Sequence, residues 1–113
     1  MDFTGKRILI TGSTMGIGLG AAEMFLERGA SVAINGRDPK TVAETVKRLG
    51  GDRLVEAPGD IGPIEVCRNV VETAIAGLGG LDCLVNNAGI CDLARLMEVT
   101  EEHWDKMMAV NLQ

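Results

Sequence analysis

The sequence predicts an α/β fold: a doubly wound parallel sheet with helices on both faces, in three αβα layers. Two observations predict it. Short runs rich in β-branched and apolar residues alternate with longer stretches in which apolar residues recur at helical spacing, and a glycine-rich turn follows the first run. Right-handed crossovers between such runs give an open parallel sheet, for which we expect the strand order 3-2-1-4.

Four short segments are predicted to be strands because each has an apolar centre and is bounded by Gly, Asn or Pro. They are residues 7–11, 31–35, 53–57 and 81–85. The order 3-2-1-4 is typical of a mononucleotide-binding half of a Rossmann fold.

Apolar residues three and four positions apart predict the helices between these strands. The first helix is marked by Ile17, Ala21, Met24 and Phe25, the second by Val42, Val46 and Leu49, and the third, over about 63–78, by Val66, Val70 and Ala74. Asp38 followed by Pro39 is typical of an N-cap and a first helical position. Glycine pairs at 50–51 and 79–80 are typical helix stops.

A fourth helix is predicted over 101–111, opened by Thr100 and with two acids in its first turn, where the helix dipole favours them. Its apolar face would hold Trp104, Met107 and Met108, together with Asn111. A buried Asn111 needs hydrogen-bond partners, which backbone groups of the sheet can supply. His103 lies about 100° round the helix, so we expect its side chain to be exposed rather than catalytic.

The composition argues against several kinds of function. The net charge of -5 disfavours duplex DNA or an anionic membrane as the main partner, since both bind basic faces. A single His excludes a multi-histidine metal centre, and the absence of Tyr excludes phenol catalysis by this chain. Three cysteines without a C-x-x-C pair, and no signal-peptide core or membrane-length apolar run, predict a soluble cytoplasmic protein.

The glycine-rich turn, residues 11–18, reads Thr-Gly-Ser-Thr-Met-Gly-Ile-Gly. Gly12 allows a tight exit from the strand, Gly16 lets backbone amides approach a pyrophosphate, and Gly18 lets the helix lie close to the sheet. The spacing Gly-x-x-x-Gly-x-Gly differs from G-x-G-x-x-G, and the lysine of a P-loop is missing. These glycines are also compatible with a tight turn that has no ligand.

A second unusual stretch, Asn86-Asn87-Ala88-Gly89, follows the fourth predicted strand. The first and fourth strands are neighbours in the predicted order, and the winding reverses between them. Both stretches therefore lie at the switch point where such sheets bind ligands. The asparagine pair can bond the ends of neighbouring strands. Tetrapeptides of this kind also occur as simple turns.

Together the two motifs resemble the short-chain dehydrogenase/reductase family. The likeness covers the whole chain, including the Trp-Asp-x-x-x-x-Val-Asn-Leu of residues 104–112, which is similar to the family's fourth helix. The resemblance implies a nicotinamide cofactor and hydride transfer to or from a carbonyl or alcohol carbon of a small molecule. It also implies a homo-oligomer, usually a dimer or tetramer.

Residues 34–38, Ile-Asn-Gly-Arg-Asp, bear on the type of cofactor. An acid there would bond a ribose 2′-hydroxyl and repel a 2′-phosphate, but position 36, where NAD-preferring relatives usually carry it, is Gly. Arg37 can hold a phosphate with a charge-assisted fork, so NADP is favoured over NAD. Ser13 and Thr14 can add hydroxyl contacts to that phosphate or face solvent. In the alternative, Arg37 is a solvated loop charge and Asp38 reaches the ribose.

By resemblance, Asp60 and Ile61 would border the adenine, with Asp60 meeting its amino group. Asp60 is also compatible with an N-cap before Pro63. At the other end, the small Ala88 and Gly89 would let the backbone lie close to the nicotinamide ribose. The predicted cofactor-binding set is Gly12, Ser13, Thr14, Met15, Gly16, Ile17, Gly18, Arg37, Asp60, Ile61, Asn87, Ala88 and Gly89. No metal site is predicted.

By resemblance, Asn111 matches the asparagine of the family's Asn-Ser-Tyr-Lys set, where it would bind a water of the proton relay. It is the one catalytic candidate, because no Ser and Tyr-x-x-x-Lys follow it within the 113 residues. A fourth strand left as an unpaired edge would also be unusual. We therefore expect residues 1–113 to be the N-terminal, cofactor-binding part of one longer domain, truncated before the fifth strand and inactive by itself. The alternatives are a non-catalytic dinucleotide-binding module and an interaction module.

Overall fold

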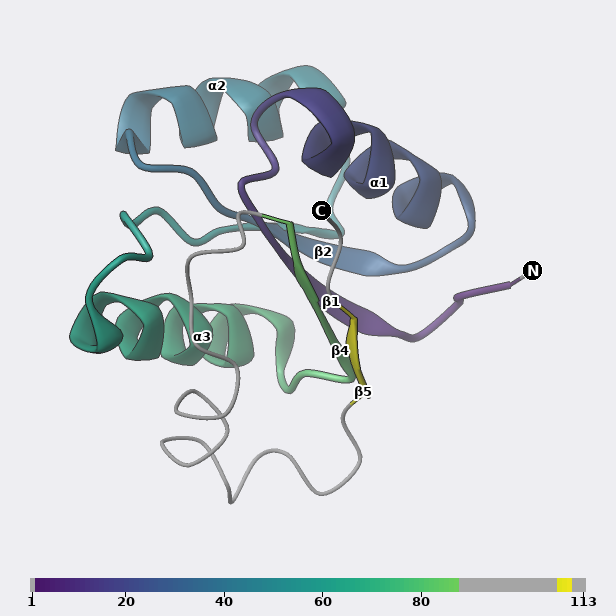
Figure 1. The fold of residues 1–113 in the computed structure, drawn as a ribbon. Helices are drawn as coiled ribbons and strands as arrows, with labels where there is room; N and C mark the ends of the chain where they lie inside the picture. The colour runs from purple at the N-terminus through teal and green to yellow at the C-terminus, as the bar shows by residue number, and fades with distance from the viewer. Residues whose placement is uncertain (1, 88–107, 111–113) are drawn as a thin grey trace.

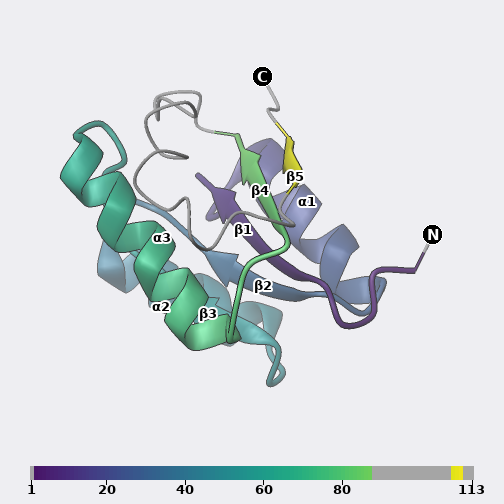
Figure 2. The same cartoon turned by 90° about the horizontal axis from the view of Figure 1, so that it is seen from below.

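The computed structural model describes residues 2–87 and 108–110. The strands are β1 (Arg7–Thr11), β2 (Ser31–Ile34), β3 (Leu54–Glu56), β4 (Cys83–Asn86) and β5 (Met108–Val110). The helices are α1 (Gly16–Glu27), α2 (Pro39–Leu49) and α3 (Ile64–Leu78). All strand pairs are parallel, and the sheet has the order β3-β2-β1-β4-β5 (Figures 1 and 2). The predicted α/β class and the order 3-2-1-4 are confirmed.

Helices cover both faces of the sheet, with α1 and α2 on one side and α3 on the other (Figures 1 and 2). Ile8 and Ile10 of β1 belong to the core under α1 and α2, whereas Leu9 belongs to the core under α3. Successive residues of a strand point to opposite faces, so an uninterrupted apolar run is what a sheet buried on both faces requires. The apolar runs of the sequence therefore account for two separate cores.

Helices α2 and α3 agree with the sequence prediction. Val42 and Val70 are buried in the two cores. The Asp38 carboxylate accepts a hydrogen bond of 2.9 Å from the amide of Lys40, so it caps α2 as its position before a proline predicts. At the C-terminus of α3, Gly79 adopts the left-handed conformation with φ 82° and ends the helix.

The inward face of α1 differs from the prediction. Ile17 is 64% exposed and Met24 is 36% exposed, while the buried positions are Gly18 and Ala22. The prediction is wrong for Ile17 and Met24. It is confirmed for Ala21 and Phe25, which pack against the core under α1 and α2. The fully buried positions hold the small residues Gly18 and Ala22 because α1 approaches the sheet closely.

The predicted helix over 101–111 is wrong for residues 108–110, which form β5. This strand pairs with β4 through Cys83↔Met108 and Val85↔Val110, so β4 is not an edge of the sheet, and a fifth strand is present. Three consecutive apolar residues satisfy helical and extended periodicity equally, and the open side of β4 supplies backbone partners that make the strand favourable. The other residues of the predicted helix lie outside the described residues, among them His103, Trp104, Met107 and Asn111.

Within the part of the chain that the structure describes, no helix is long and apolar enough to cross a bilayer.

A charged clamp joins the beginning of β1 to the turn before β4. The Arg7 guanidinium donates to both carboxylate oxygens of Asp82, at 2.9 and 3.1 Å, and to the carbonyl of Gly79 at 2.9 Å. The backbone amide of Arg7 donates to the same carboxylate at 2.9 Å. These bonds from Arg7 lower the pKa of Asp82, opposed in part by desolvation. The clamp fixes the edge of the sheet at which the strands begin.

This clamp predicts an acid-sensitive component of stability. Because the folded pKa of Asp82 lies below its unfolded value of about 3.9, its contribution is present above that value and is lost as pH falls through the folded pKa. Asp82→Asn should lower the free energy of unfolding by about 0.5–1 kcal/mol at neutral pH, a range that allows for solvent screening. The two proteins should converge in strong acid. Thermal unfolding against pH measures this. Asp52→Asn, which removes an exposed acid, is the control, and parallel curves for Asp82→Asn and the parent would contradict the prediction.

Candidate functional site

The ends of β1 and β4 meet at the carboxyl edge of the sheet, where the winding reverses. Thr11 lies opposite Asn86, and its hydroxyl donates to the Asn86 side-chain oxygen at 3.1 Å. One residue further along the chain, the side-chain amide of Asn87 donates through Nδ2 to the carbonyl of Gly12 at 3.0 Å. The two motifs that the sequence places at the switch point are therefore bonded to each other.

Three glycines shape the turn between β1 and α1. Gly12 and Gly16 have φ of 62° and 59°, a conformation that side chains disfavour. Gly18 has an ordinary φ but no room: a Cβ there would collide with the Gly12 carbonyl and lie 2.8 Å from the Asn87 side-chain nitrogen. Gly18 thus lets α1, the end of β1 and the residue after β4 meet at one point.

The N-terminus of α1 is open to solvent. Met15, the N-cap residue, is extended and 71% exposed, and Gly16 and Ile17 are also exposed. No side chain caps this terminus, and the first turn carries no acid. The first backbone N–H groups of a helix lack partners within it, and the helix dipole favours an anion there. The geometry fits a phosphate group on the amides of residues 16–18.

Ser13 has a role that its sequence context does not indicate. It is buried, and its hydroxyl donates to the carbonyl of Ile10 at 2.8 Å and accepts from the amide of Asn35 at 2.9 Å. The sequence suggested that the Ser13 hydroxyl either contacts a phosphate or faces solvent. In the structure the hydroxyl does neither, because it points inward and bonds to backbone groups. Ser13 holds the turn in place from inside.

Thr14 lies over Gly36 at the end of β2. A Cβ at position 36 would be 2.7 Å from the Thr14 methyl group and 3.3 Å from a methyl group of Val42. Arg37 and Asp38, which follow, are exposed. The Asp38 carboxylate caps α2, so the capping role considered for it is the one the structure contains.

Asp60 and Ile61 follow β3 and point in different directions. Asp60 is exposed, whereas Ile61 is 4% exposed and belongs to the core under α3. The N-cap of α3 is Pro63, without a side-chain cap bond, so the interpretation of Asp60 as an N-cap is wrong. Ala88, Gly89 and Asn111 lie outside the described residues.

One residue of this edge was missed by the sequence analysis. Asn35, 1% exposed, bonds through its side chain to Gly12, Ala57 and Gly59. The only available signal was a polar residue at the end of a buried strand, which cannot reveal the remote groups that satisfy it.

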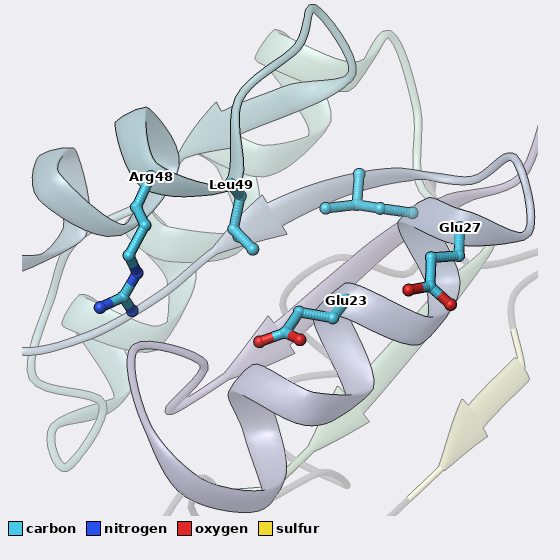
Figure 3. A pocket seen from close by; sticks show the side chains of 5 residues that line it. Glu23, Glu27, Arg48 and Leu49 are labelled. Carbon is cyan, nitrogen blue, oxygen red and sulfur yellow. The ribbon is translucent and has the colours of Figure 1, made fainter.

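A separate pocket of about 380 Å³ lies between α1 and α2 (Figure 3). It is lined by Glu23, Leu26, Glu27, Arg48 and Leu49. These residues come from the C-terminal halves of the two helices. A helix that connects two parallel strands runs antiparallel to those strands, so its C-terminus lies near the edge of the sheet where the strands begin. The pocket is therefore at the edge where the strands begin, away from the glycine-rich turn.

Among the described residues, no group of three or more His, Cys, Asp or Glu could hold a metal ion.

Residues 6–113 match the family described as short chain dehydrogenase. The chain belongs to this family. An uncharacterized oxidoreductase of Thermotoga maritima is 43% identical over 116 residues, a match that covers 100% of this chain and 45% of that protein. The chain thus spans less than half the length of this relative. The family resemblance stated from the two motifs is confirmed.

Two solved structures that this chain resembles contain different nicotinamide cofactors. One is 3-ketoacyl-(acyl-carrier-protein) reductase from Brucella melitensis complexed with NADH, with a TM-score of 0.72, 36% identity and 78% of this chain covered, against 36% of that chain. The other is the Pseudomonas aeruginosa RhlG/NADP complex, with a TM-score of 0.70, 35% identity, and coverage of 76% of this chain and 35% of that chain. Family membership alone therefore selects neither cofactor.

The close approach at Gly18 predicts opposite effects for two alanine substitutions in α1. Gly18→Ala should destabilise the protein by about 1–3 kcal/mol, as overpacking does, and weaken dinucleotide binding by displacing the turn from Asn87. Gly20→Ala, where a Cβ meets nothing within 4 Å, should stabilise it by about 0.5–1 kcal/mol and leave binding unchanged. Thermal unfolding and calorimetric titration measure both. Equal behaviour of the two variants would show that the contact at Gly18 is unimportant.

Proposed function

We propose that this chain forms the cofactor-binding part of an NADP-dependent oxidoreductase, which transfers hydride between nicotinamide and a carbonyl or alcohol group of a small molecule. The observation that carries the proposal is the uncapped N-terminus of α1, held at the switch point by the bond from Asn87 to the Gly12 carbonyl. An anion site at the switch point of a doubly wound sheet is where a dinucleotide binds.

In this proposal, the pyrophosphate lies on the turn formed by residues 12–18, and Ser13 acts by holding that turn. Met15 and Ile17, exposed beside it, supply apolar contacts to the cofactor. The adenine lies near the segment that contains Asp60 and Ile61, and Asn87, Ala88 and Gly89 lie beside the nicotinamide ribose. The nicotinamide supplies or accepts the hydride, and the described residues bind and orient it.

The preference for NADP rests on the end of β2. Position 36 has no side chain, and Thr14 and Val42 occupy the space above it, so no acid stands there to repel a 2′-phosphate. Arg37 is exposed at this point and free to turn toward a phosphate, while Asp38 is used as a helix cap. These are the features that favour NADP over NAD.

Asn111 is proposed to bind a water of the proton relay, by its match to the family's asparagine. The family's Ser and Tyr-x-x-x-Lys would complete the catalytic set outside these residues, so the chain alone would hold the cofactor without transferring hydride. A cytoplasmic location and a homo-oligomeric state, both expected above, remain predictions.

The test of the function uses the protein expressed from its complete reading frame. Calorimetric titration with NADPH and NADH measures binding, and the absorbance of reduced nicotinamide follows hydride transfer with a panel of alcohols and carbonyl compounds. Binding with turnover is the expected result. Binding without turnover on any compound would indicate the non-catalytic module instead. Absence of binding to either dinucleotide would overturn the proposal.

The proposed phosphate contact predicts that Arg37→Ala weakens NADPH binding roughly 10- to 100-fold, the loss expected for hydrogen bonds to a charged group, with little effect on NADH. Calorimetric dissociation constants for both cofactors measure this. Arg48→Ala is the matched control, because it makes the same change of charge in the pocket at the opposite edge of the sheet. Equal losses for NADPH and NADH, or no loss for either, would contradict the NADP preference.

A further inference from the structure

We propose that Asn35 is a positioning residue that couples the two ends of the dinucleotide site. It joins the glycine-rich turn to the segment after β3, residues 57–60, which is the adenine side in the proposed function on which this inference rests. Its side chain lies where three segments meet: the glycine-rich turn, the end of β2 and the segment after β3.

The Asn35 side chain uses three hydrogen-bonding positions at once. Its Oδ1 accepts from the amide of Gly12 at 3.1 Å, and its Nδ2 donates to the carbonyls of Ala57 at 2.9 Å and Gly59 at 3.2 Å. Both hydrogens of the side-chain nitrogen are therefore used. They bond the segment after β3, whereas the side-chain oxygen bonds the glycine-rich turn. An amide of this length supplies both donors and the acceptor, whereas a carboxylate supplies acceptors alone.

The backbone of Asn35 strengthens the same connection. Its amide donates to the Ser13 hydroxyl at 2.9 Å, and its carbonyl accepts from the Ser13 amide at 2.8 Å. On the other side, the Gly59 amide donates to the carbonyl of Gly36 at 2.9 Å. The end of β2 is thus held between the glycine-rich turn on one side and the segment after β3 on the other.

Each of these bonds lies at the carboxyl edge of the sheet. Asn35 is 1% exposed, and its three side-chain bonds run to residues 22 to 24 positions away. A buried amide is costly unless it is fully bonded, so it specifies the relative position of the loops that satisfy it. It sets the separation between the pyrophosphate amides and the adenine side.

The experiment compares Asn35→Leu and Asn35→Ala, neither of which adds a charge beside the turn, with the parent protein, all expressed from the complete reading frame. Leu is close in shape but forms no hydrogen bond, and Ala removes the side-chain amide altogether. Thr45→Val is the matched control, because it removes a buried hydroxyl bonded to the Thr41 carbonyl at 2.8 Å within α2, away from the loops. Dissociation constants for NADPH and for adenosine 2′-monophosphate are measured at a temperature where every variant is folded.

We expect both Asn35 variants to bind NADPH at least about tenfold more weakly, with a smaller loss for the adenosine fragment, which does not need the two loops aligned. In the hydride-transfer assay, the KM for NADPH should rise, and kcat at saturating cofactor should change little. Thr45→Val should lower thermal stability without changing either dissociation constant. Parent-like NADPH affinity in the Asn35 variants, or equal losses for NADPH and the fragment, would overturn the inference.

A second measurement covers the case in which the variants do not fold. In the parent protein, unphosphorylated adenosine, a fragment without the 2′-phosphate that would contact Thr14 of the turn, should slow hydrogen exchange of the Gly12 amide, because Asn35 transmits the ordering of residues 57–60 to that amide. Unchanged exchange at Gly12 with the fragment bound would overturn the coupling. If the parent binds no dinucleotide at all, the proposed function fails instead, and the two failures are distinguishable.

Discussion

The close approach of α1 to the end of β1 is the constraint on which the candidate site depends. With no side chain at Gly18, the helix backbone lies against the Gly12 carbonyl, and the same carbonyl accepts the bond from Asn87. One backbone oxygen thus joins β1, α1 and the residue after β4. Any side chain at position 18 would separate all three. The direction of the first amides of α1, and hence the anion site, follows from this contact.

The two edges of the sheet are stabilised by different chemistry. The edge where the strands begin is held by an ion pair, Arg7 with Asp82. The carboxyl edge is held by neutral groups: the amides of Asn35 and Asn87 and the hydroxyl of Ser13. A fixed carboxylate beside the turn would repel an anion, and a fixed cation would need its own counter-charge. Neutral hydrogen-bonding groups hold the loops rigid and leave the field of the helix terminus available to a phosphate.

The sequence predicts the parts of this structure that local patterns determine. Helix α2 with its Asp38 cap and helix α3 follow from periodicity and from capping residues close in sequence. Strand order follows from the handedness of crossovers and from the order typical of a mononucleotide-binding half. Two errors come from apolar residues taken without their context: Ile17 and Met24 are exposed because Gly18 and Ala22 form the inner face of α1, and residues 108–110 form a strand because β4 offers partners. The roles of Ser13 and Asn35 depend on contacts with residues about 22 to 24 positions away, which no local pattern contains.

The end of β2 shows why one residue does not determine selectivity for a phosphate. The space above Gly36 is filled by the methyl groups of Thr14 and Val42, so a side chain at position 36 requires Thr14 to move. Thr14 belongs to the glycine-rich turn, whose neighbouring residue Ser13 is bonded to Asn35. A change at position 36 therefore acts on the turn that would hold the pyrophosphate as well as on charge near the ribose. Selectivity at this edge is a property of Thr14, Gly36 and Arg37 together, because packing and charge meet there.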